Sequence, residues 1–175
     1  MPGARVLTVT PNSSAAVAGI AVGDEIISVN GESLTDVIHY QIATDGSTLE
    51  LEIRSGGLER LLEITKGVGE PLGITLDNPV FDRIRTCDNH CPFCFIYQLP
   101  EGSRSSLKIK DDDYRLSFLY GNFTTLTRFT EVDLERVITE RLSPLNVSIH
   151  ATDPEVRAEL LRNARGVSSM RWLSE

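Results

Sequence analysis

The sequence predicts two successive domains: a β-rich domain over residues 1–76 and the first βα units of an incomplete, TIM-like α/β barrel over residues 77–175. Three observations predict this fold class. Short alternating runs separated by Gly, Pro and Asn fill the first part, as in small β-rich domains. The second part alternates apolar runs with amphipathic segments, which implies parallel strands. A length of 175 residues is enough for one or two domains.

The composition excludes several classes of protein. The net charge of −8 argues against nonspecific binding to the nucleic-acid backbone, so a nucleic-acid partner is not expected. The first residues lack the long apolar core of a signal peptide, and no apolar run has the length of a membrane-spanning helix. We therefore expect a cytoplasmic protein with no membrane partner, in a compartment that keeps thiols reduced.

The elements of the first part follow from its periodicity and turn residues. Strands are expected over residues 5–10, 24–30, 49–54 and 58–65, and helices over residues 15–18 and 34–43. Ser13 and Ser14 can cap the first helix, and Gly19 can end it. Leu49, Leu51 and Ile53 alternate with charged residues, as in a half-buried strand.

Residues 12–31 resemble the bacterial PDZ domain pattern, in which a helix of small residues leads through Gly-Asp into a strand that ends at Asn-Gly. The resemblance implies that a peptide or protein C-terminus adds to a sheet edge. The nearest match to the family's carboxylate-binding loop is Leu72-Gly73-Ile74, where Pro71 replaces a glycine. The alternative is a module that only packs against the second part of the chain.

The elements of the second part alternate in type. Strands are expected over residues 80–84, 116–119 and 147–150, and a helix over residues 131–142 with Thr130 as its N-cap. Asp153-Pro154 begins another helix, which Gly166 ends. The acidic run Asp111–Asp113 is expected to be a solvated loop, because like charges avoid shared burial.

All three cysteines of the chain lie close together in a C-x3-C-x2-C pattern: Cys87, Cys91 and Cys94. Three thiolates on one loop can hold three irons of a cubane iron–sulfur cluster and leave the fourth iron open. A zinc site is an alternative, but it needs a fourth ligand, and His90 lies between two of the cysteines. A disulfide would leave one cysteine unpaired, and burial as small apolar side chains remains the simplest alternative.

The three cysteines together with Phe93 resemble the C-x3-C-x-aromatic-C motif of radical S-adenosylmethionine enzymes. The resemblance implies that the cysteines hold a 4Fe–4S cluster. Its open iron would chelate the amino and carboxylate groups of S-adenosylmethionine, and one electron would then yield a 5′-deoxyadenosyl radical. A reductant such as a flavodoxin or ferredoxin is implied as a partner.

The same resemblance implies further cofactor-binding residues. Gly121 and Asn122 match the glycine-rich stretch that follows the family's second strand, although the usual Gly-Gly-Glu form is absent. Ser148 and His150 are expected on one face of a strand, at the end where parallel α/β folds place their sites. His150 could equally be a structural histidine.

Four segments extend the resemblance over most of the chain: residues 94–100, 110–119, 121–127 and 148–157. They are similar to an uncharacterised bacterial family that joins a PDZ-like domain to a radical-enzyme domain and is labelled an iron–sulfur oxidoreductase. A complete barrel of that kind needs more βα units, at roughly 30 residues each. We therefore expect a truncated catalytic domain, with enzymatic activity belonging to the complete family member.

The sequence thus predicts a radical S-adenosylmethionine enzyme of unknown substrate. An alternative from another class is a PDZ peptide-binding adaptor whose cysteine loop holds a structural metal. A third is electron transfer by the cluster alone, which would normally require four protein ligands.

Overall fold

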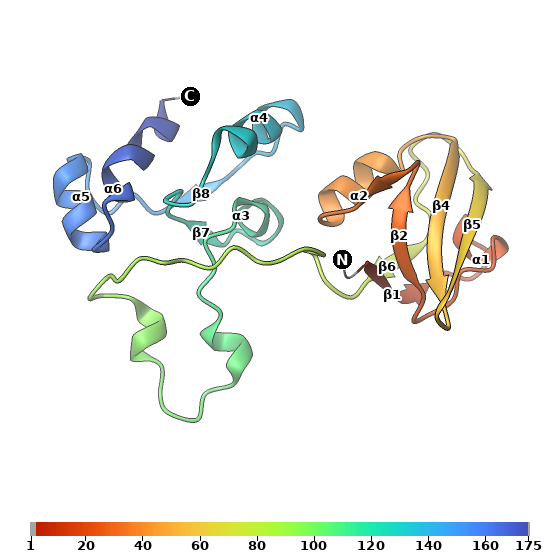
Figure 1. Cartoon of the computed structure of the whole chain (residues 1–175), viewed down its shortest axis with the longest axis horizontal. Helices are drawn as coiled ribbons and strands as arrows, with labels where there is room; N and C mark the ends of the chain where they lie inside the picture. The colour runs from red at the N-terminus through yellow and green to blue at the C-terminus, as the bar shows by residue number, and fades with distance from the viewer. Residues whose placement is uncertain (1–2, 175) are drawn as a thin grey trace. The chain divides into compact units, whose positions relative to one another are not determined.

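The computed structural model describes residues 3–174, and the chain divides into two compact units, Met1–Arg83 and Ile84–Glu175 (Figure 1). Each unit is described by itself. Among the described residues, no helix is both long enough and apolar enough to cross a membrane.

An antiparallel sheet with strand order β5-β4-β2-β1-β6 forms the first unit, and the short strand β3 (Glu32–Ser33) pairs with β2. The strands of the main path are β1 (Ala4–Val9), β2 (Glu25–Val29), β4 (Thr48–Ser55), β5 (Leu58–Thr65) and β6 (Ile74–Leu76). All four predicted strands are present, and β6 is an edge strand that the periodicity had not predicted. The central β4 strand alternates as expected, with Leu49, Leu51 and Ile53 buried.

Two short helices accompany this sheet: α1 (Ser14–Val17) and α2 (Val37–Ala43). Ser13 is the N-cap of α1 and accepts a hydrogen bond from the Ala16 amide, which confirms the predicted start. The second helix begins later than predicted, because the buried Asp36 caps it by accepting from the His39 amide at 3.0 Å.

The core of the first unit is apolar and continuous. The fully buried side chains of Ile26, Leu51 and Ile53 lie on neighbouring strands β2 and β4. Burying each such side chain contributes about 1.5–3 kcal/mol. Gly23 and Gly31, at the two ends of the segment that includes β2, have positive φ angles of 92° and 79°, which glycine adopts without strain.

The second unit has one short parallel sheet, formed by β7 (Phe123–Thr124) and β8 (Asn146–Val147). Parallel pairing is what the strand–helix alternation predicts. Its α-helices are α3 (Tyr114–Tyr120), α4 (Glu131–Thr139), α5 (Pro154–Leu161) and α6 (Arg165–Ser168), with 3-10 turns at Phe95–Gln98, Ser105–Lys108 and Ser169–Leu173. One strand pair does not establish the expected barrel.

Two of the strands predicted for residues 77–175 are wrong. Residues 116–119 lie inside α3, because Asp113 caps that helix and Gly121 ends it at φ 74°. Residues 80–84, most of which fall in the first unit, form no strand, and Val80 makes only an isolated bridge to Asp36. The third strand is shorter than residues 147–150, since His150 has φ 67°, outside the β region.

The predicted helix starts are confirmed. Thr130 caps α4 in a capping box with Asp133, and Asp153 caps α5 ahead of Pro154. Helix α5 ends earlier than predicted, because Arg162 adopts a left-handed conformation at φ 49°.

Candidate functional site

The cysteine loop is an irregular segment tied to the rest of its unit through the backbone. The Cys87 amide donates to the Lys110 carbonyl at 2.7 Å, beside the bridge between Thr86 and Asp111. The Cys94 amide donates to the Cys91 carbonyl at 3.1 Å, which closes a tight turn. These bonds hold the three cysteines on one side of the second unit.

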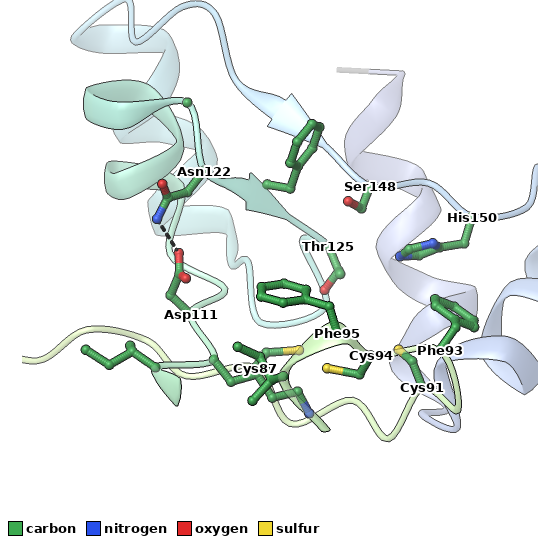
Figure 2. A pocket seen from close by; sticks show the side chains of 15 residues that line it. Cys87, Cys91, Phe93, Cys94, Phe95, Asp111, Asn122, Thr125, Ser148 and His150 are labelled. Atoms are coloured by element: carbon green, nitrogen blue, oxygen red, sulfur yellow. Dashed lines mark hydrogen bonds between the residues drawn. The ribbon is translucent and has the colours of Figure 1, made fainter. Parts of the chain in front are cut away.

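A cavity of about 470 Å³ opens over this loop (Figure 2). It brings together every residue that the sequence predicted for the metal and the cofactor: Cys87, Cys91, Cys94, Phe93, Gly121, Asn122, Ser148 and His150. Its apolar walls come from Phe95, Ile96, Ile109 and Phe123. Residues far apart in the sequence thus line one space.

The wall opposite the cysteines comes from the ends of the short strands. Figure 2 shows Ser148 and His150 across the cavity from the cysteine loop. We expected these two residues on one face of a single strand, and this expectation is wrong. Strand β8 ends at Val147, and the chain turns at His150, which has a positive φ. The Ser148 amide still continues the strand pairing, donating to the Thr124 carbonyl at 2.9 Å.

Gly121 and Asn122 lie at a different point of the fold from the one predicted. They precede β7 and end helix α3, rather than following a strand. The Asn122 amide group donates to Asp111 at 3.0 Å, which orients it at the cavity wall (Figure 2). The left-handed Gly121 makes the sharp exit from the helix that brings the next residues to the cavity.

Two aromatic rings meet beside the cysteines. The centroids of Phe93 and His150 are 5.1 Å apart, with the planes tilted by 52°. Burial lowers the pKa of His150, and the positive charge of Arg157 lowers it further. The imidazole is therefore neutral at pH 7 and offers a flat, partly apolar surface.

The three cysteines form no disulfide. Burial raises the pKa of Cys87 and of Cys91. Within residues 3–174, no three side chains of His, Cys, Asp or Glu are grouped closely enough to hold one metal ion. The His90 side chain is exposed and does not line the cavity.

The acidic run is not the solvated loop that we expected. Asp112 and Asp113 are buried, with 4% and 1% of their surface exposed. Asp112 accepts from the hydroxyls of Thr124, Thr125 and Thr127. Hydrogen bonds of this kind offset the cost of burying a carboxylate, so Asp112 holds the end of strand β7 beside the cavity.

Two buried residues that support the site were missed. Asn89, fully buried in the cysteine loop, donates to the Thr125 hydroxyl at 2.9 Å and accepts from Asn163 at 2.7 Å. Arg157 donates from α5 to the carbonyls of Thr125 and Ile149. No local pattern distinguishes them, because their partners are distant in the sequence.

The first unit has a groove of its own, of about 440 Å³. The predicted peptide-binding residues Leu72, Gly73 and Ile74 line it, together with Tyr40 and Gln41 of α2. Their segment is anchored to the sheet, since the Gly73 carbonyl accepts from the Thr10 amide at 2.7 Å. The groove therefore lies between the edge strand β6 and helix α2.

Comparison with protein-family models finds two matches. Residues 66–175 match the Radical SAM-like domain, and residues 5–55 match the PDZ domain. No curated protein matches the chain.

Solved structures similar to the chain include two PDZ domains. The PDZ domain of the SdrC-like protein from Listeria monocytogenes has 23% identity and a TM-score of 0.38, covering 44% of this chain and 90% of its own. That of the SdrC-like protein from Listeria innocua has 23% identity and a TM-score of 0.38, covering 45% of this chain and 98% of its own.

Proposed function

The chain belongs to the family of proteins with a Radical SAM-like domain, and from this premise we propose that it is a radical S-adenosylmethionine enzyme with an N-terminal PDZ domain. One observation carries the proposal: the three cysteines and the five predicted cofactor residues line a single cavity. We propose a domain boundary near residue 76 and a reducing, cytoplasmic environment for the free thiols.

The donor set fits a 4Fe–4S cluster with one open iron. Cys87, Cys91 and Cys94 would each supply a thiolate to a different iron, so their sulfurs need not converge on one ion. Tetrahedral zinc would require such convergence and a fourth ligand. The exposed His90 does not reach the cavity, so it does not supply one as the loop lies here.

Cluster and S-adenosylmethionine together would supply a carbon-centred radical after one-electron reduction by a flavodoxin or ferredoxin. The chain's own residues would bind and orient S-adenosylmethionine and the substrate. Phe93 and His150 present the aromatic surface on which a planar ring can stack. Ser148 and Asn122 also line the cavity and offer hydrogen-bonding groups. Apolar side chains such as Phe95 limit access of water to the reacting atoms.

The test is metal and sulfide analysis after anaerobic reconstitution of the full chain, followed by EPR of the reduced protein with and without S-adenosylmethionine. We expect about four irons per chain and a spectrum that the ligand alters. Cys94→Ala should lose the cluster, whereas His90→Ala, the matched control at an exposed loop position, should keep it. Zinc in place of iron, lost in the His90→Ala variant, would refute the proposal and favour a structural metal.

A second function is supported by the groove of the first unit. We propose that the PDZ domain binds a peptide C-terminus by strand addition to β6. This strand has its second edge unpaired among the described strands, and the groove beside it reaches helix α2. The positive φ of Gly73, 81°, sets the turn of the loop that would face the carboxylate.

Peptide binding can be tested with an immobilised array of hexapeptides that carry either a free or an amidated C-terminus. Strand addition predicts binding that requires the free carboxylate. Gln41→Trp places a large side chain in the groove from the exposed face of α2 and should abolish binding. Val17→Trp, at an 83% exposed position on α1, is the control. Equal loss in both variants, or equal binding of amidated peptides, would contradict the proposal.

A further inference from the structure

Lys110 is joined to the cysteine loop at two points. Its backbone carbonyl accepts from the Cys87 amide at 2.7 Å. Its ammonium group donates to the carbonyl of Asn89, which lies between Cys87 and Cys91. It also donates to the Tyr97 hydroxyl at 3.1 Å and lies 4.9 Å from the centroid of that ring. A single residue from outside the motif thus holds the first half of the loop.

The charge of this side chain is not neutralised nearby. Lys110 is the only Lys or Arg among the described residues that line the cavity. Within residues 3–174 it forms no ion pair with a carboxylate, whereas Arg165, another cation beside the loop, is paired with Asp88. Arg128 lies beside the start of the loop and donates to the Thr86 carbonyl at 3.2 Å, but it does not line the cavity. Asp111, its neighbour at the cavity wall, bonds to Asn122 instead.

Lys110 also remains charged at neutral pH. The ammonium group of lysine ordinarily titrates far above pH 7. A fixed positive charge therefore borders the space in which the three sulfur ligands lie.

A positive charge beside an iron–sulfur cluster has a defined physical effect. Reduction adds one electron and no proton to a group that already carries thiolate charge. A nearby cation stabilises the more negative, reduced state, so it raises the reduction potential. Net charge and hydrogen bonding around the sulfurs are known to set such potentials.

We propose that Lys110 is a positioning residue that braces the Cys87–Cys91 segment and raises the reduction potential of the cluster at the three cysteines. The inference rests on the proposed function, because it requires the cluster. The electron would come from an external low-potential donor of the flavodoxin or ferredoxin class. Lys110 would make this one-electron reduction more favourable.

The experiment is an EPR-monitored redox titration of the reconstituted full chain, without S-adenosylmethionine, using dithionite and mediators. Lys110→Met should shift the midpoint to a more negative potential, with the ratio of reduced to oxidised cluster about tenfold lower at the wild-type midpoint. Lys110→Arg should keep the wild-type midpoint. Lys108→Met, at an exposed position in the same segment, makes the same change in net charge and should have no effect.

Each outcome decides the inference. Equal midpoints in Lys110→Met and Lys108→Met overturn it, and so does an arginine variant that shifts as far as the methionine variant. Lys110→Met could bind little iron, and the arginine variant then decides. If Lys110→Arg binds the cluster and has the wild-type midpoint, the role of the charge is supported. If Lys110→Arg binds no cluster, the inference is overturned. A wild-type chain that binds no iron overturns both proposals, whereas a loaded wild type with unshifted variants overturns only this one.

Discussion

Replacing Arg157 with methionine should destabilise the second unit strongly. The guanidinium group is buried, with 1% of the residue exposed. It donates to the carbonyls of Ile149 at 2.9 Å, Gly166 at 2.7 Å and Thr125 at 2.6 Å, and to the hydroxyl of Ser169 at 2.5 Å. One side chain thus joins the ends of both short strands to the C-terminal helices.

The expected loss in the free energy of unfolding follows from these hydrogen-bond partners. A buried acceptor that loses its donor costs about 1–3 kcal/mol, so three carbonyls would cost about 3–9 kcal/mol. Removing the buried cation recovers part of this, because desolvating an ion costs several kcal/mol. Burial already lowers the pKa of Arg157, which reflects that desolvation. We expect a net loss of about 2–4 kcal/mol in the free energy of unfolding.

The assay is urea unfolding followed by the fluorescence of Trp172, the only tryptophan of the chain, which packs in the second unit 5.4 Å from the Phe129 ring. With a slope of about 1 kcal/mol per molar urea, the Arg157→Met midpoint should fall by about 2–4 M. The urea midpoint of Arg157→Lys should lie between those of the wild type and Arg157→Met, since an ammonium group satisfies fewer acceptors than a guanidinium group. Arg162→Met, at an exposed position that ends the same helix, is the control. A midpoint within about 0.5 M of wild type for Arg157→Met would refute this reasoning.

Two further predictions concern backbone strain and pH. Gly73→Ala should cost the first unit about 1–3 kcal/mol more than Gly31→Ala, as measured by thermal unfolding in far-UV circular dichroism. Both have positive φ, but an added Cβ at Gly73 would lie 2.3 Å from the Ser13 Cβ, whereas the space at Gly31 is open; equal losses would contradict the prediction. Burial tends to raise the pKa of Asp113, but hydrogen bonds from Arg115 and the Arg85 amide outweigh burial and hold this pKa below its usual value. The stabilising contribution of the carboxylate is therefore present above the pKa of the unfolded chain and is lost as the pH falls through the lowered pKa of the folded chain. Acid titration of the unfolding free energy should show this loss in the wild type, and an Asp113→Asn variant with the same slope would disprove the role of the carboxylate.

The elements of the first unit could be predicted because their signals are local. The turn residues Gly23 and Gly31 and the alternation of Leu49, Leu51 and Ile53 specify the backbone without reference to distant residues. The edge strand β6 was missed because it is only three residues long and exists through its pairing with β1. Short strands carry little periodicity of their own.

The second unit was harder to predict for the same physical reason. A four-residue apolar run such as Leu116–Leu119 suits a strand or a helix equally, and the cap at Asp113 together with the ending at Gly121 favours the helix. The burial of Asp112 depends on three hydroxyls that follow it by more than ten positions. Charge repulsion within the run was a weaker effect than these hydrogen bonds.

The sequence by itself supplied the residues on which the proposed cofactor depends. Cys87, Cys91 and Cys94 are spaced as three candidate thiolate ligands with Phe93 before the last, and this spacing is a covalent property of the chain that needs no tertiary contact. Only the tertiary structure decided that Ser148 and His150 face those cysteines across a cavity, and that Lys110 reaches the loop between them. Such contacts join segments far apart in the chain, so they depend on packing and on hydrogen bonds that no local pattern encodes.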